Sequence, residues 1–140
     1  MATGSKIQAK RGQERTRLVA DEIVEVLEDC GVEYAFGIPG GAIVSIFDAL
    51  SRSKKIKVIL TQHECSAAYM AMGRTMASYG KKIGVCFSTA GPGITNLITG
   101  VATAYEERVP IFVLTGNVSS DLIGRGAVQD AYWSGVDAVK

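Results

Sequence analysis

The chain has 140 residues, of which 47% are hydrophobic and 21% charged, and its formal net charge at pH 7 is +1. This composition is typical of a folded globular domain and excludes a disordered chain. A nearly neutral charge gives no reason to expect a nucleic acid or an anionic membrane surface as a partner. No stretch reaches the roughly 18 uncharged apolar residues that a membrane-spanning helix needs.

The spacing of apolar residues divides the chain into alternating helices and strands. A polar tail covers residues 1–12, and residues 13–140 are expected to form one domain. The predicted helices cover 14–30, 42–52, 63–79 and 93–106. The predicted strands cover 34–36, 57–60, 83–87 and 110–114. The segment 116–127 is rich in loop residues, and 127–138 fits neither element clearly.

This alternation predicts an α/β fold, with a parallel sheet flanked by helices on both faces. In such a sheet ligands bind beyond the carboxyl ends of the strands. Four features directly follow predicted strands: the turn at 37–41, Glu64, the turn at 90–93 and Thr115-Gly116. We therefore expect a ligand site at this edge. We also expect the domain to continue past residue 140.

Glu64 is the most informative single residue, because it lies between the apolar run 58–60 and the small-residue stretch 65–73. A carboxylate where a buried strand meets a buried helix is costly unless it has a partner or a task. The residues alone leave two interpretations open. In one, Thr61 and Glu64 form a capping box at the start of a helix. In the other, Glu64 is an acid inside a ligand site.

Neither glycine turn carries a common phosphate-binding pattern. The segment 37–41 lacks the Gly-x-Gly-x-x-Gly spacing of dinucleotide-binding folds, and the chain has no Gly-Lys-Ser/Thr loop. The second turn, at 90–93, has polar residues on both sides. Thr89, Thr95 and Asn96 could hydrogen-bond a polar ring or merely cap the following helix.

The three cysteines, Cys30, Cys65 and Cys86, are far apart in the sequence and form no metal-binding pattern. We expect them to be reduced and buried, as in a protein of the cytoplasm or of an organellar stroma. The single histidine, His63, is interpreted as structural. No metal ligand is therefore assigned within this chain.

An ordered set of motifs covers roughly residues 14–135 and resembles a known family. The motifs are Phe36–Ile43, Asp48–Leu50, His63-Glu64, Ala67–Ala71, Thr89–Asn96, Thr99–Ala104, Val109-Pro110, Leu114–Gly116 and Ala127–Asp130. They resemble the N-terminal, pyrimidine-binding domain of thiamine-diphosphate-dependent enzymes, most closely the acetolactate synthase (acetohydroxyacid synthase) large subunit. One motif would be weak evidence, but the ordered set is specific and favours the ligand-site interpretation of Glu64.

The resemblance implies a role for each matching residue. Glu64 would hydrogen-bond a ring nitrogen of the cofactor's pyrimidine and so promote loss of the thiazolium C2 proton. Gln129 would face the reacting centre. The residues that would line the pyrimidine pocket or approach the cofactor and substrate channel are Pro92, Gly93, Asn96, Gly40 and Gly41. The departures from the family pattern bear on the substrate more than on the cofactor, and they are Gln62, Val128 and Asp130.

The same resemblance implies a larger enzyme. Such enzymes decarboxylate pyruvate and join the two-carbon unit to a second 2-oxo acid, in branched-chain amino acid biosynthesis. A separate domain of a second subunit would hold the diphosphate and Mg2+, a further domain could hold FAD, and the assembly would be a homodimer or higher oligomer. The chain alone would then be inactive. The alternatives are another thiamine-diphosphate-dependent 2-oxo acid decarboxylase, a subunit of a split enzyme, or a non-catalytic module of the same fold.

Overall fold

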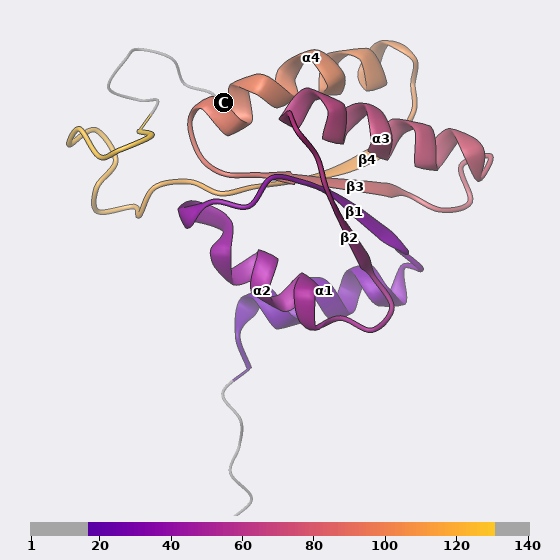
Figure 1. Cartoon of the computed structure of the whole chain (residues 1–140), viewed down its shortest axis with the longest axis horizontal. Helices are drawn as coiled ribbons and strands as arrows, with labels where there is room; N and C mark the ends of the chain where they lie inside the picture. Colours follow the sequence, from indigo (N-terminus) through magenta and orange to yellow (C-terminus); the bar gives the residue numbers. More distant parts are fainter. Residues whose placement is uncertain (1–16, 131–140) are drawn as a thin grey trace, which may run out of the picture.

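The computed structural model describes residues 17–130, which form one parallel sheet between two helical layers. The strands run in the order β2-β1-β3-β4 and are β1 (Tyr34–Gly37), β2 (Lys57–Leu60), β3 (Gly84–Ser88) and β4 (Ile111–Thr115). One face is covered by α1 (Val19–Asp29) and α2 (Val44–Arg52), the other by α3 (Glu64–Ala77) and α4 (Pro92–Glu106) (Figure 1). The predicted α/β fold is confirmed.

The element bounds agree with the sequence prediction within two residues, except at the start of the first helix. The first helix begins at Val19, because Leu18 has extended backbone angles, and residues 14–16 lie outside the described part. The helix predicted from residue 42 is divided into a 3-10 turn, η1 (Gly41–Ile43), and α2. The ambiguous segment 127–138 is described only to residue 130, and that part contains neither helix nor strand.

The core has one apolar layer on each side of the sheet, and β3 contributes to both. Val85 and Phe87 pack with residues of α1 and α2, whereas Cys86 packs with the α3 and α4 layer. All five residues of β3 are buried, as expected for an inner strand of a parallel sheet. Because alternate side chains enter opposite layers, the register of β3 fixes both helical layers relative to the sheet.

Small residues bring α3 and α4 close together. A Cβ atom on Gly100 would lie 2.6 Å from the Cβ of Ala68 and 3.0 Å from the carbonyl oxygen of Cys65. Glycine at this position therefore allows the first turns of α3 to lie against α4 without a side chain between them. This close packing places Glu64, the first residue of α3, beside Asn96 of α4.

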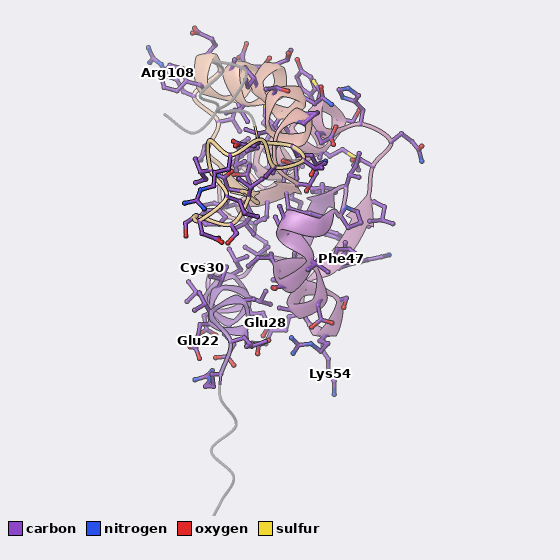
Figure 2. The ribbon with its side chains drawn as sticks, turned by 90° about the vertical axis from the view of Figure 1, so that its left-hand side faces the viewer. Glu22, Glu28, Cys30, Phe47, Lys54 and Arg108 are labelled. Carbon is purple, nitrogen blue, oxygen red and sulfur yellow. The ribbon has the colours of Figure 1, made fainter. Side chains whose placement is uncertain are left out.

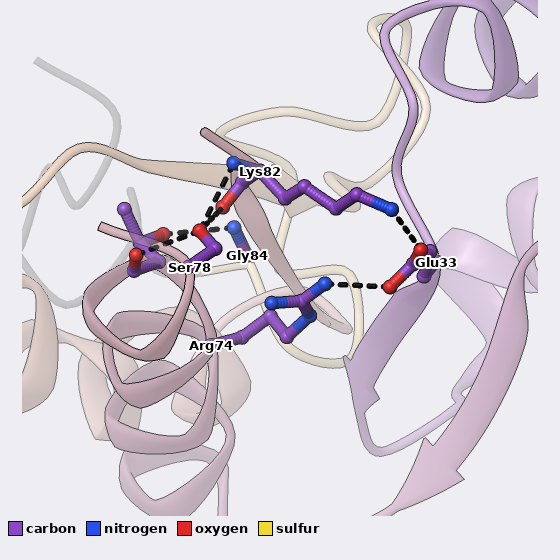
Figure 3. A network of polar contacts seen from close by, with 6 residues as sticks. Glu33, Arg74, Ser78, Lys82 and Gly84 are labelled. Atoms are coloured by element: carbon purple, nitrogen blue, oxygen red, sulfur yellow. Dashed lines mark hydrogen bonds and ion pairs between the residues drawn. The ribbon is translucent and has the colours of Figure 1, made fainter. Parts of the chain in front are cut away.

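The opposite end of α3 is held by a polar network (Figure 3). Glu33 lies just before β1 and pairs with Arg74 at 2.5 Å and also with Lys82. Hydrogen bonds from Lys82 and Arg74 hold the pKa of Glu33 below its ordinary value. Near the same end, the Thr75 hydroxyl accepts a hydrogen bond from the Gly84 amide at 2.9 Å. These contacts fix α3 to the sheet at its carboxyl end.

The cysteines differ from the prediction in their burial. All three are free, as expected, but only Cys86 is buried; Cys65 is partly buried and Cys30 is exposed at the end of α1 (Figure 2). Burial raises the pKa of the Cys86 thiol to about 12. Cys30 is exposed because it caps α1 rather than facing the sheet. No helix within residues 17–130 has the length and apolar character needed to cross a membrane.

Candidate functional site

The segments that follow β1, β3 and β4 meet at the carboxyl edge of the sheet. A Cβ atom on Gly40 would lie 2.5 Å from the Cβ of Thr89, and the Gly116 amide donates to the Ser88 carbonyl at 3.0 Å. The loop after β4 returns to the second glycine turn, where a Cβ on Gly91 would lie 2.7 Å from the carbonyl oxygen of Gln129. The structure thus brings the two glycine turns and the chain near Gln129 together.

Glu64 is the first residue of α3 and is buried, with 9% of its surface exposed. Its Oε2 atom accepts a hydrogen bond from Nδ2 of Asn96 at 3.0 Å. An amide donor offsets part of the cost of burying the carboxylate. The structure describes no second hydrogen bond to Glu64 within residues 17–130, so Asn96 holds one of the two carboxylate oxygens.

The capping-box interpretation of Thr61 and Glu64 is wrong. A capping box would place Thr61 at the N-cap of α3. The N-cap is instead His63, two residues further along the chain, and α3 begins at Glu64. The Thr61 hydroxyl donates to the His63 carbonyl oxygen at 3.1 Å. The Glu64 carboxylate is directed to Asn96 instead of to a backbone amide of its own turn.

His63 has the structural role expected of it. Its Nδ1 atom accepts a hydrogen bond from the backbone amide of Cys65 at 3.2 Å. The backbone angles of His63 are extended (φ −153°, ψ 144°), as is usual for an N-cap residue.

The second glycine turn immediately precedes α4, so this helix begins at the carboxyl edge of the sheet. Gly91 has a φ of +60°, a conformation that glycine adopts readily and other residues rarely do. Pro92 is the first helical residue and is exposed, whereas Gly93 is buried. The Thr95 hydroxyl donates to the Pro92 carbonyl at 3.1 Å, so this side chain serves the helix and not the site.

Thr89 has a buried hydroxyl with no hydrogen-bond partner in the described part of the chain. Its side chain lies between Gly40 and Gly93, where added Cβ atoms would come within 2.5 Å and 3.2 Å of it. Such an unpaired polar atom is uncommon in a protein interior and calls for an explanation. The sequence alone does not single out Thr89 as a site residue, because the burial of its hydroxyl depends on the distant turn at Gly40.

The remaining candidate residues lie at the same edge but differ in their surroundings. A Cβ on Gly41 would meet no atom of the described residues within 4 Å, its chain neighbours aside. Gln129 is exposed and has a φ of +66°, and its side chain makes no hydrogen bond within residues 17–130. Asp130, one of the departures from the family pattern, accepts from the Gly124 amide at 2.7 Å. Within the same range, no three His, Cys, Asp or Glu side chains are grouped as metal ligands.

Comparison with known protein families shows to which family the chain belongs. Residues 17–137 match the family described as "Thiamine pyrophosphate enzyme, N-terminal TPP binding domain". The chain belongs to this family. Thiamine pyrophosphate is another name for thiamine diphosphate, so the resemblance seen in the sequence is confirmed.

Relatives in this thiamine-diphosphate enzyme family include acetolactate synthases. Over 117 residues, or 84% of the chain, it is 44% identical to acetolactate synthase of Mycobacterium avium and to the acetolactate synthase large subunit of Haemophilus influenzae. Over 111 residues, or 79% of the chain, it is 49% identical to a probable acetolactate synthase large subunit of Methanocaldococcus jannaschii. The aligned part covers 18% to 20% of the length of these relatives.

Proposed function

We propose that this chain supplies the pyrimidine-binding part of an acetolactate synthase. The proposal is carried by one observation, the buried Glu64 carboxylate held by Asn96 at the carboxyl edge of a parallel sheet. A buried acid with one oxygen held by an amide donor suits a nitrogen-containing ring that must share a proton. The identity to acetolactate synthases over most of the chain supports the same assignment.

The residues at this edge fit an aminopyrimidine ring. The unpaired Thr89 hydroxyl is a polar atom that a polar ligand would satisfy. Gly40 and Gly93 border it without side chains, and any Cβ atom would reduce the space beside it. A polar lining next to side-chain-free backbone is typical of a site where a flat ligand approaches closely.

Each candidate residue then has a task. Glu64 hydrogen-bonds a ring nitrogen and holds the proton shared with it, and Asn96 fixes the orientation of the carboxylate. Pro92 and Gly93 line the pyrimidine pocket with Asn96, and Gly40 and Gly41 approach the cofactor or substrate channel. Gln129 faces the reacting centre, and its side chain is exposed. When bound, thiamine diphosphate supplies an electron sink for decarboxylation of a 2-oxo acid.

The proposed whole enzyme decarboxylates pyruvate and joins the two-carbon unit to a second 2-oxo acid, a step of branched-chain amino acid biosynthesis. Residues 13–140 would be its N-terminal pyrimidine-binding part. Mg2+ and the diphosphate would be held by another domain of a second subunit, FAD by a further domain, and the enzyme would be a homodimer or higher oligomer of the cytoplasm or an organellar stroma. The chain alone would be inactive, in keeping with its 18% to 20% share of its relatives.

A different 2-oxo acid substrate is the second candidate. It is favoured by the departures near Gln129, because Val128 is 89% exposed and Asp130 is bonded to the loop through Gly124. A changed set of side chains around Gln129 would alter which 2-oxo acid fits, without altering the pyrimidine site.

The test measures acetolactate formation from pyruvate by the complete enzyme, with thiamine diphosphate, Mg2+ and FAD omitted in turn. Product that requires thiamine diphosphate and Mg2+ supports the proposal, and loss of activity without FAD supports acetohydroxyacid synthase in particular. If pyruvate is not consumed but another 2-oxo acid is, the second candidate is correct. If no 2-oxo acid is consumed, the catalytic proposal fails.

A further inference from the structure

His63 immediately precedes Glu64 and determines where α3 begins. Its imidazole provides the side-chain cap of the helix, through Nδ1 and the Cys65 amide at 3.2 Å. Its carbonyl oxygen accepts from the amides of Ser66 and Ala67 at 3.1 Å and 3.3 Å, and from the Thr61 hydroxyl. Both the side chain and the backbone of His63 are thus engaged in ordering the first turn.

The direction of the Glu64 carboxylate depends on this start. Glu64 is the first residue of α3, so the hydrogen bonds that order the first turn also set the direction of its side chain. The turn has unpaired amides unless a side chain accepts from them. The Thr61 hydroxyl donates to the His63 carbonyl, whereas the His63 imidazole is the side chain that accepts from an amide of this turn.

We propose that His63 is a positioning residue, whose imidazole cap holds the Glu64 carboxylate against Asn96. This inference deepens the proposed function and rests on it for its catalytic consequence, whereas its structural part can be tested without cofactor. The imidazole is exposed, and it acts through the helix start. An asparagine, which is also an effective N-cap, can therefore replace it.

The test compares three variants: His63→Leu removes the cap, His63→Asn retains it, and Ser53→Ala is the control. The Ser53 hydroxyl accepts from the amides of Lys55 and Ile56 at the far end of the sheet, so its loss lowers stability away from the site. Nuclear magnetic resonance of this chain reports the Asn96 side-chain amide signal and the hydrogen exchange of the Cys65 amide. The complete enzyme gives kcat and the KM for pyruvate.

In His63→Leu we expect the Asn96 amide signal to move toward that of a free amide, and the Cys65 amide to exchange about fivefold faster, the factor for a cap of about 1 kcal/mol. The kcat should fall by at least this factor, with a smaller change in KM. His63→Asn should restore both signals and most of the turnover, and Ser53→Ala should change neither.

Three results would overturn the proposal. An unchanged Asn96 signal in His63→Leu shows that the cap does not position the carboxylate. A normal kcat in His63→Leu shows that the cap has no catalytic consequence. Equal loss of kcat in His63→Asn and His63→Leu shows that the imidazole itself takes part in the reaction. If the unmodified enzyme consumes no 2-oxo acid, the proposed function fails, and the Asn96 signal still decides whether the cap positions Glu64.

Discussion

Nδ2 of Asn96 donates a hydrogen bond to Oε2 of Glu64 across 3.0 Å, between two helices whose starts lie at the same edge of the sheet. The contact depends on Gly100, which allows α3 and α4 to approach closely. The hydrogen bond gives the buried Glu64 carboxylate, which is costly to bury alone, an amide donor from α4. The pair therefore connects the packing of the two helices with the chemistry proposed for the site.

Replacing Asn96 should affect both stability and turnover. Asn96→Leu keeps the helix and the side-chain size but leaves the buried carboxylate without its donor, at a cost of about 1–3 kcal/mol in the free energy of unfolding. Turnover of the complete enzyme should also fall, because the carboxylate loses its fixed orientation. Thr95→Ala is the matched control, since within residues 17–130 its hydroxyl bonds only to the Pro92 carbonyl. Equal effects of the two substitutions would contradict the assigned role of Asn96.

Two neighbouring glycines should respond differently to alanine. A Cβ on Gly40 would lie 2.5 Å from the Cβ of Thr89, whereas a Cβ on Gly41 would meet no atom of the described residues within 4 Å, its chain neighbours aside. Gly40→Ala should destabilise the chain by about 1–3 kcal/mol through this overlap, and Gly41→Ala should leave the melting temperature nearly unchanged. Thermal unfolding of both variants checks the prediction. A stable Gly40→Ala variant would show that the two turns are not in contact.

Removing the Thr89 hydroxyl should have opposite effects on folding and on binding. Thr89→Val keeps the side-chain shape and removes an unpaired buried oxygen, so the free chain should become about 1 kcal/mol more stable. The complete enzyme should bind thiamine diphosphate roughly five- to tenfold more weakly, the factor for one lost hydrogen bond. Chemical denaturation and calorimetric titration measure the two effects. Unchanged cofactor affinity would mean that the hydroxyl does not contact the cofactor.

The Glu33 network should make stability depend on acid pH. Hydrogen bonds from Lys82 and Arg74 lower the pKa of Glu33 below its ordinary value of 4.5. The stabilisation is therefore complete above about pH 4.5 and is lost as the pH falls through the lowered pKa. Glu33→Gln should flatten this acid part of the melting-temperature curve, most clearly at low salt because the network is partly exposed. Parallel curves for the two proteins would contradict the prediction.

The sequence predicts which helices and strands follow one another along the chain, because the buried faces of these elements have a regular apolar spacing. It placed Glu64 at the edge of the sheet for the same reason. It could not decide between a capping box and a ligand site, because that choice depends on the residue at which α3 begins. The N-cap at His63 excludes the capping box, and only the folded chain shows it.

Other features depend on contacts between distant segments. Thr89 looked like one of several polar residues near a turn, and its burial arises from Gly40 on another loop. Cys30 was expected to be buried because it follows the apolar spacing of its helix, but it lies at the cap, where the chain turns away from the sheet. Local patterns therefore predicted the elements better than the surroundings of individual side chains.

The central claim is that the Glu64 carboxylate activates thiamine diphosphate, and the most direct measurement is the turnover of Glu64→Gln in the complete enzyme. Glutamine retains the size and can still accept from Asn96, but it cannot hold the shared proton. We expect normal folding, shown by an unchanged circular dichroism spectrum, and a turnover at least about 100-fold lower, the usual contribution of a positioned acid or base. A turnover near that of the unmodified enzyme would contradict the claim.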